Sequence, residues 1–546
     1  MKAKLIFASL FLSMAGLSAQ TYQVSISEQD EPMMKGKFEP TWSSLENYQV
    51  PEWFRNVKFG IWAHWGPQCV EGSGDWMARS MYMEGTREYE YHVKHYGHPS
   101  EVGFKDIIPL WKAENWDPDK LVAFYKKIGA QYFFALGNHH DNMDLWDSKY
   151  QPWNSVNMGP KKDILAGWEK AARKYGLYFG VSLHADHAWS WYEPSQRHDT
   201  KGPKKGIPYD GKLTKADGKG KWWEGYDPQD LYAQNHPLSE NSWDNGMIHR
   251  QWAWGNGVCV PSQEYCTNFY NRTLDVINRY NPDLLYFDVT VAPFYPVSDA
   301  GLKIAAHFYN HNMATHKGKL EAVMFGKILD ENQRKALVWD VERGAPNKII
   351  DQPWQSCSCI GGWHYNTSIY EKNEYKSAAY VAKLLVDIVS KNGNLLLSVP
   401  LRADGTFDEK EEKILNEFGA WMNINKEAIY DTRPWVVFGE GPIAEEDIPF
   451  NAQGFNEGSY SQAGAKEIRF TQTPKYLYAT VLAWPADGKV NIKSLAADSK
   501  LYEGKIRKVE LLGYGKVDFV RTAEGLSVTL PAQPLNQIAP VLRIAK

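Results

Sequence analysis

Cysteine is scarce in this 546-residue sequence, and no zinc-binding pattern occurs in it. The five cysteines form no CxxC pair, and the zinc motif HExxH is absent. An odd and low count excludes a disulfide-stapled scaffold, although one bridge is compatible with an oxidising compartment. The absence of both motifs excludes the zinc sites that are easiest to recognise in a sequence.

The chain also lacks a large excess of charge and, beyond its first residues, any long apolar run. Lys and Arg total 61 against 65 Asp and Glu, so the formal net charge is −4. This near-balance argues against nucleic acid or an anionic membrane as the partner. No stretch is long and apolar enough to span a bilayer, so we expect no membrane insertion.

Residues 1–19 have the pattern of a secretory signal peptide. Basic Lys2 and Lys4 precede an apolar run from Leu5 to Leu17, and small residues precede Gln20. The run is too short for a membrane anchor. We therefore predict an exported protein, periplasmic or secreted after cleavage.

Aromatic residues are abundant, with 23 Trp and 31 Tyr. Such usage is typical of platforms that stack against sugar rings, but large aromatic cores give the same count. More than 500 residues follow the signal peptide, too many for one compact core. We predict a catalytic domain over residues 20–435 and a second domain over residues 436–546.

Short apolar runs alternate with amphipathic helical segments through the first of these domains. The runs fall at residues 58–65, 131–136, 177–183, 284–287, 321–328, 336–341 and 394–400. This alternation predicts parallel strands with helical crossovers, and about eight such units make a (β/α)8-like, TIM-type barrel. Residues 185–266 interrupt the rhythm, and we interpret them as long loops on the active-site face with one short strand. After residue 435, short alternating runs bounded by Gly, Asp and Pro predict an antiparallel β-sandwich.

Polar residues stand where the predicted strands end. They are His64, His139, His140, His184, Asp288 and Glu342. Because the carboxyl ends of barrel strands meet at one rim, we expect these side chains to converge.

Three protein classes use such a set. A retaining glycosidase needs an ionised carboxylate and a protonated one about 5–5.5 Å apart. A metal-dependent hydrolase would use the histidines and an aspartate as zinc ligands, although the first strand offers His64 alone where metal barrels usually present two histidines. A catalytically inactive sugar-binding protein is the third class.

Six motifs carry a specific resemblance. KFGIWAHWGPQCV (58–70) resembles the KFGIFIHWG signature of the α-L-fucosidases, glycoside hydrolase family 29. GAQYFFALGNHHDN (129–142), GLYFGVSLH (176–184), PDLLYFD (282–288), PWQSCSCIGGWHYN (353–366) and VDIVSKNGNLLLSVPLRADG (386–405) follow in the family's order. The resemblance covers nearly all of residues 50–435, and it implies the same barrel and β-sandwich.

The resemblance also implies roles for individual residues. Asp288 matches the family's nucleophile. The positions that match sugar-binding residues are His64, His139, His140, Trp76, Tyr286 and Trp363, the last beside the sugar's methyl group, with His184 similar to a histidine of some members.

The sequence departs from the family pattern at three positions. Asp75 stands where many members have Glu, and Asn142 replaces a Gly. Gln355 stands where many members have a Glu assigned as acid/base, and an amide cannot cycle a proton. We therefore predict Glu342 as the acid/base with Asp340 as second choice. We also place Arg343 in the substrate site, because it directly follows Glu342. It would set the charge state of Glu342 or form an ion pair with Asp340.

These observations predict an exported retaining exo-α-L-fucosidase that acts on glycans and needs no metal or cofactor. The nearest alternative is an α-L-galactosidase acting on a polysaccharide, because L-galactose is L-fucose with a 6-hydroxyl, which an apolar pocket rejects only weakly. Linkage and oligomeric state stay open.

Overall fold

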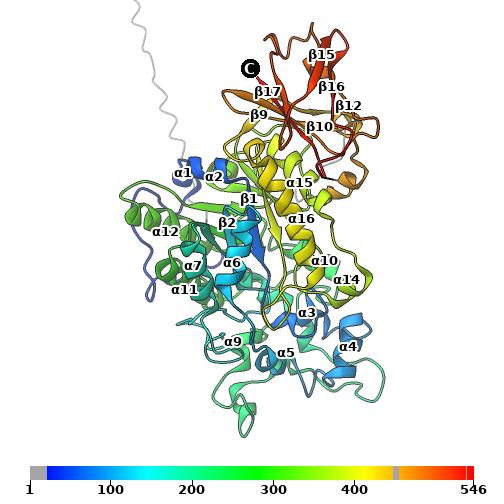
Figure 1. Ribbon diagram of the computed structural model, residues 1–546. Coiled ribbons are helices and arrows are strands. Elements are labelled where there is room, and N and C mark those ends of the chain that lie inside the picture. The colour runs from blue at the N-terminus through cyan, green and yellow to red at the C-terminus, as the bar shows by residue number, and fades with distance from the viewer. Residues whose placement is uncertain (1–20, 447–453, 537) are drawn as a thin grey trace, which may run out of the picture.

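Eight parallel strands form a closed barrel in chain order, which confirms the predicted barrel (Figure 1). The computed structural model describes residues 21–446, 454–536 and 538–546, so the predicted signal peptide lies outside the described residues. The strands are β1 Phe59–Ala63, β2 Tyr132–Asn138, β3 Tyr178–Leu183, β4 Leu284–Phe287, β5 Val323–Gly326, β6 Val338–Glu342, β7 Trp354–Cys359 and β8 Gly393–Ser398.

Apolar runs in the sequence predicted seven of these strands, and β7 was not among them. This strand reads WQSCSC and has no apolar run, yet every residue in it is buried. Its Gln355 donates a hydrogen bond to Asp340 on β6 (2.8 Å) and accepts one from Tyr132 on β2 (3.1 Å). Polar groups that satisfy one another inside the barrel therefore replace the apolar pattern on which strand prediction depends.

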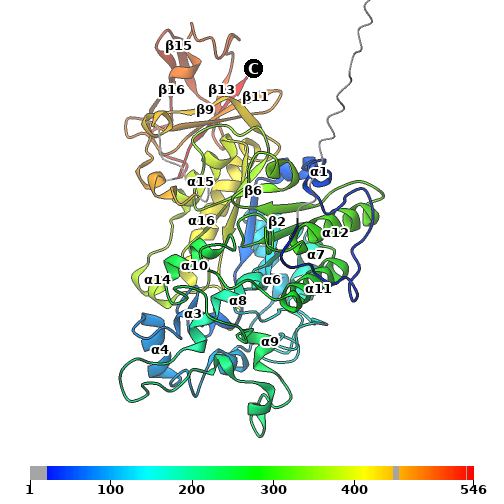
Figure 2. The same ribbon diagram turned by 180° about the vertical axis from the view of Figure 1, so that it is seen from behind.

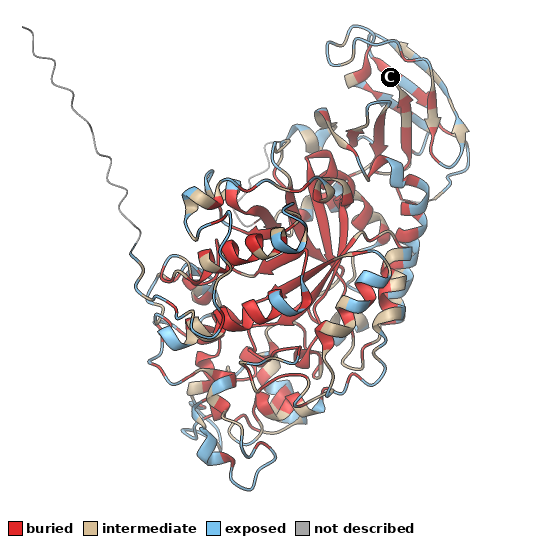
Figure 3. Cartoon of the chain, turned by 90° about the vertical axis from the view of Figure 1, so that its left-hand side faces the viewer, coloured by how far each residue is buried: buried red, intermediate tan, exposed pale blue. Residues whose placement is uncertain are grey.

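Six longer helices cover the outside of the barrel, with their buried faces toward the strands (Figure 3). They are α6 Pro118–Lys127, α7 Ile164–Lys174, α11 Gln263–Tyr280, α12 Ala300–Thr315, α15 Ala378–Ser390 and α16 Glu409–Asn425. Two of them begin at aspartate N-caps: Asp117 accepts from the Lys120 amide, and Asp163 accepts from the Ala166 amide. No helix among the described residues is both long and apolar enough to cross a bilayer.

Residues 185–266 form short helices and loops at the end of the barrel opposite the C-terminal sheets (Figure 1). The predicted short strand is wrong, because the described residues of this segment contain only one isolated bridge, between His198 and Pro208. The short helix α10 (Asn245–Gln251) belongs to this segment and carries His249, which reaches the cavity at the barrel rim.

Beyond the barrel, two antiparallel sheets pack over one apolar core, as predicted (Figure 2). The larger sheet has the order β14-β13-β17-β11-β10-β9 and the smaller one β12-β16-β15. Their bounds are β9 Arg433–Glu440, β10 Ile468–Gln472, β11 Tyr476–Val481, β12 Lys489–Ile492, β13 Val509–Leu511, β14 Gly515–Lys516, β15 Asp518–Thr522, β16 Gly525–Thr529 and β17 Val541–Ala545.

A buried ionic cluster joins the barrel to these sheets. Asp387 on α15 accepts hydrogen bonds from Arg469 on β10 (2.5 Å), from Lys391 (2.7 Å) and from the Tyr460 hydroxyl (2.5 Å). Burial raises the pKa of Asp387, but Lys391 and Arg469 outweigh it and lower this pKa to about 2. The carboxylate is thus ionised and fully paired.

We expect Asp387→Asn to lower the free energy of unfolding at pH 7 by about 3 kcal/mol, because buried Lys391 loses its carboxylate partner and Arg469 keeps only Glu467. The folded pKa of Asp387 lies below its unfolded value of about 3.9. Its contribution is therefore complete above that value and is lost as pH falls through about 2. Urea denaturation between pH 7 and pH 3 should show the wild-type advantage shrinking.

The matched control is Glu427→Gln. Glu427 pairs with Arg543 between the same two parts of the chain, but at the surface. A surface pair contributes about 1 kcal/mol or less. Equal losses in the two variants would contradict a special role for the buried cluster.

Candidate active site

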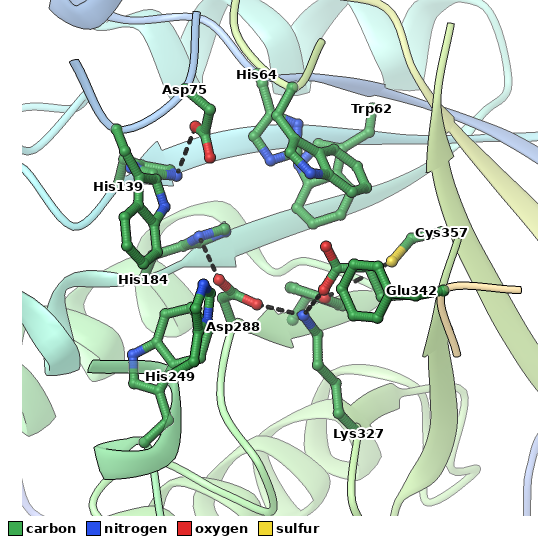
Figure 4. A pocket seen from close by; sticks show the side chains of 15 residues that line it. Trp62, His64, Asp75, His139, His184, His249, Asp288, Lys327, Glu342 and Cys357 are labelled. Carbon is green, nitrogen blue, oxygen red and sulfur yellow. Dashed lines mark hydrogen bonds and ion pairs between the residues drawn. The ribbon is translucent and has the colours of Figure 1, made fainter. Parts of the chain in front are cut away.

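A cavity of about 440 Å³ opens at the carboxyl ends of the barrel strands (Figure 4). Its lining combines three histidines from strand ends, two catalytic-type carboxyls, a lysine and a wall of aromatic rings. The lining residues are Trp62, His64, Asp75, Trp76, His139, His184, His249, Trp252, Tyr286, Asp288, Lys327, Glu342, Cys357, Trp363 and Phe455. The barrel thus brings most of the predicted residues together.

Lys327 lies between the two predicted catalytic carboxyls (Figure 4). Its ammonium contacts Asp288 Oδ1 at 2.5 Å and Glu342 Oε2 at 2.6 Å. Because both oxygens contact one nitrogen, they are no more than about 5.1 Å apart. A separation of this size is close to the about 5–5.5 Å between the carboxyls of a retaining glycosidase.

The two carboxyls have opposite electrostatic environments. Burial raises the pKa of Asp288, but the Lys327 ammonium and the hydrogen bond from His140 outweigh it and hold this pKa well below its ordinary value. Burial raises the pKa of Glu342, Lys327 opposes the shift, and the Asp288 carboxylate reinforces it. The two pKa values are therefore shifted in opposite directions, as the roles of nucleophile and acid require.

His140 supports the nucleophile from behind. Its Nε2 lies 3.2 Å from Asp288 Oδ2, and its Nδ1 lies 2.8 Å from the carbonyl of His184. Both ring nitrogens therefore contact oxygen atoms, which fixes the orientation of the ring. The ring is buried and does not line the cavity, so its predicted contact with a sugar hydroxyl gives way to a contact with Asp288.

The other strand-end histidines present neutral rings to the cavity. Burial, with a contribution from neighbouring histidines, lowers the pKa values of His64, His139 and His184 well below their ordinary range. His64 Nδ1 is 2.9 Å from Ser398 Oγ, and Gln68 donates to His139 Nδ1 at 2.8 Å. Neutral imidazoles that are oriented in this way can donate to and accept from uncharged hydroxyl groups.

Aromatic rings form the remaining walls. Trp62, Trp363 and Tyr286 line the barrel side, and the Tyr286 hydroxyl donates to buried Asp340 at 3.3 Å. On the rim, Trp76 stacks on His249 of α10, with ring centroids 4.9 Å apart. Aromatic faces and sparse polar groups of this kind are typical of sugar pockets.

Two predicted roles fit the geometry poorly. Arg343 does not line the cavity, and its guanidinium pairs with Glu457 (2.9 Å) rather than with Glu342 or Asp340. Asp340 is buried beneath the cavity, where it accepts hydrogen bonds from Gln355, Cys357 and Tyr286. It is thus committed to barrel contacts, whereas Glu342 faces the open space.

The departure at Asn142 has a local explanation. Its φ is +66°, a left-handed conformation in which Gly is common and Asn is the next best tolerated residue. Its amide donates to the carbonyls of Asp230 and Leu231 and accepts from Arg272. Asn142 thereby ties the loop that contains the paired histidines to the 185–266 segment.

Several lining residues were not predicted from the sequence. Lys327 directly follows β5, and this position at a strand end could have identified it as a site residue. It was missed because only histidines and carboxylates were expected to act at strand ends. Trp62 shares the inward side of β1 with His64, two residues away. His249, Trp252 and Phe455 come from segments without a readable pattern.

Two groups of side chains have the spacing of metal ligands. One is His139, His140 and His184, and the other is Asp75, His139 and His364. Both nitrogens of His140 are already engaged, and Asp75 Oδ1 accepts from His364 Nδ1 at 2.7 Å. These contacts occupy both nitrogens of His140 and one oxygen of Asp75, whereas both ring nitrogens of His184 and Nε2 of His364 have no hydrogen-bond partner among the described residues.

Comparison with known proteins gives consistent matches. A family model described as Alpha-L-fucosidase matches residues 25–427, and a model of the Alpha-L-fucosidase C-terminal domain matches residues 462–545. The chain is 24% identical to human plasma alpha-L-fucosidase over 92% of this chain and 90% of that protein. It is also 24% identical to rat tissue alpha-L-fucosidase, over 91% and 89%.

Among solved structures, the chain resembles Thermotoga maritima alpha-fucosidase. The TM-score is 0.65 at 24% identity, over 93% of this chain and 100% of that one. This likeness shows a shared fold.

We expect Lys327→Met to lower the free energy of unfolding by up to about 3–5 kcal/mol, the loss for a fully buried pair, because the half-buried Asp288 would lose its principal counter-charge. Removing the uncompensated charge of Asp288 should restore part of the lost free energy of unfolding. The double variant Lys327→Met/Asp288→Asn should therefore be more stable than Lys327→Met alone. Chemical denaturation of the single and double variants at pH 7 measures both effects.

Lys319→Met is the control, since Lys319 is a largely exposed lysine that pairs with Glu321. Its loss should be close to zero. A double variant that is less stable than Lys327→Met alone would contradict the charge argument.

Proposed function

The chain belongs to the α-L-fucosidase family of glycoside hydrolases, and on that premise we propose that it is a retaining exo-α-L-fucosidase. Its substrates are glycans. The enzyme would remove terminal α-L-fucosyl residues, and closely related α-L-galactosyl residues are the second choice of substrate. The observation that supports it most is the pair Asp288 and Glu342, which contact one lysine and have pKa values shifted in opposite directions.

In the first step, Asp288 Oδ attacks the anomeric carbon while Glu342 gives its proton to the leaving oxygen. This forms an ester between sugar and Asp288 and leaves Glu342 ionised. Lys327 contacts both carboxyls, so its positive charge compensates Asp288 before the step and Glu342 after it. No charge has to enter or leave the cavity.

In the second step, water attacks the anomeric carbon and its proton passes to Glu342. The ester bond breaks, the sugar leaves with its original configuration, and Asp288 is ionised again. The Lys327 ammonium then compensates Asp288 once more, which returns the site to its starting state.

The sugar itself would be held by the neutral histidines and Asp75. His184 has two ring nitrogens without a hydrogen-bond partner among the described residues, and it lines the cavity beside Asp288. Trp363 and Trp62 present apolar faces, with Trp363 proposed to face the C6 methyl group. A 6-hydroxyl at that position distinguishes L-galactose from L-fucose.

The remaining assignments belong to the same proposal. Catalysis is assigned to residues 20–435 and a supporting role to residues 436–546. Export rests on the signal-peptide pattern of residues 1–19, which lie outside the described residues.

The direct test is hydrolysis of 4-nitrophenyl α-L-fucoside. Asp288→Asn should lose at least about 10⁴-fold in kcat, since covalent catalysis depends on it. Glu342→Ala should lose about 10²–10⁴-fold and recover in azide, with formation of a fucosyl azide of retained configuration. Undiminished turnover by Glu342→Ala would move the acid/base elsewhere, with Asp340→Asn tested next.

Two comparisons separate the alternatives. Faster hydrolysis of the α-L-galactoside would reverse the sugar assignment. Loss of turnover after dialysis against a chelator, with recovery on adding Zn²⁺, would favour the metal-dependent class.

The pH profile of kcat/KM gives a further test. Asp288 must be ionised, so the acidic limb follows its lowered pKa, and Glu342 must be protonated, so the alkaline limb follows its raised pKa. Lys327→Met removes the charge that lowers both pKa values. We therefore expect both limbs to move to higher pH, and Lys327→Arg to keep them near the wild-type positions. An acidic limb that stays in place in Lys327→Met would contradict the assigned role of this lysine.

A further inference from the structure

One residue of the cavity comes from the chain that follows the barrel domain. Phe455 lies beyond β9, in the part of the chain that leads into the C-terminal sheets. It is 54% exposed, and apart from His249 the other lining residues are buried or half-buried. A large apolar ring at the mouth of a polar pocket therefore leaves much of its surface uncovered.

The backbone fixes this ring beside the acid/base. The Phe455 amide donates to the carbonyl of Glu342 at 2.8 Å, and Gly454 forms a parallel bridge with Glu342. A Cβ at Gly454 would lie 2.2 Å from the Glu342 carbonyl oxygen, so only glycine permits this approach. Phe455 itself has a φ of +60°, a costly conformation for a bulky residue and one that is typical of functional positions.

The following residues clamp the segment onto β6 and β7. Asn456 exchanges two hydrogen bonds of 3.0 Å with the backbone of Ala345. Glu457 pairs with Arg343 and Lys376, both at 2.9 Å, and accepts from Ser358 Oγ at 2.6 Å. Arg343 is thus a positioning residue that holds the segment carrying Phe455.

We propose that Phe455 forms the +1 subsite and stacks against the ring of the leaving group. The inference rests on the proposed function, in which Glu342 protonates the leaving oxygen. The departing group must then pass Glu342 on the open side of the cavity, where Phe455 is held. The ring's apolar face suits a pyranose or an aromatic aglycone, so the substrate class is a glycoside whose fucosyl-bearing unit is cyclic.

The test compares leaving groups with and without a ring. Phe455→Ala should lower kcat/KM for 4-nitrophenyl α-L-fucoside about tenfold more than for α-L-fucosyl fluoride, whose leaving group makes no stacking contact. Phe455→Tyr should restore the wild-type ratio. Tyr514→Ala, which removes a similarly exposed ring far along the C-terminal sheets, should leave both values unchanged.

A second readout uses the covalent intermediate. With α-L-fucosyl fluoride as donor and methyl β-D-galactopyranoside as acceptor, an acceptor hydroxyl gives its proton to Glu342 and attacks the anomeric carbon as the ester to Asp288 breaks. Because the acceptor occupies the +1 subsite, Phe455→Ala should lower the ratio of transfer to hydrolysis about tenfold.

Equal losses on both substrates with an unchanged transfer ratio would overturn the assignment and show a structural role only. An unchanged ratio of kcat/KM values in Phe455→Ala would also overturn it. Wild-type protein that releases no fluoride from α-L-fucosyl fluoride would contradict the proposed function itself, and with it the subsite.

Discussion

The site depends on one buried ammonium that is shared by two carboxyls. Asp288, Lys327 and Glu342 follow or end three consecutive barrel strands, so barrel closure places them side by side. A buried carboxylate without a counter-charge would take up a proton, and two close carboxylates would share one. Lys327 lowers the pKa of Asp288, while burial and the Asp288 charge raise the pKa of Glu342, so the two carboxyls differ in acidity.

The neutral histidines complete the same electrostatic arrangement. His64, His139 and His184 are buried together, and charging all of them next to Lys327 would accumulate positive charge in a small volume. Their low pKa values keep the cavity polar but uncharged away from the carboxyls. Such surroundings suit sugar hydroxyls, which need donors and acceptors rather than counter-ions.

Much of the fold and part of the site could be predicted from the sequence, and the limits have physical causes. Apolar runs revealed seven strands, because both faces of a parallel barrel strand are buried; β7 lacked the signal, since its buried polar groups pair with one another. Asp288 and Glu342 were predictable from their positions at strand ends. The pairing of Arg343 with Glu457 was not, because the partner lies 114 residues away in a segment without a pattern.

The ion pair between Arg343 and Glu457 joins the barrel to the segment that carries Phe455, so the proposed recognition of the leaving group lies outside the barrel strands. The residues proposed to break the glycosidic bond follow or end barrel strands, where any change disturbs a closed core. The ring beside Glu342 belongs to a segment outside the barrel, fastened by a few contacts at its edge. Evolution can therefore lengthen, shorten or replace this segment and so redirect the enzyme toward other glycans, while the inherited machinery of bond cleavage stays untouched.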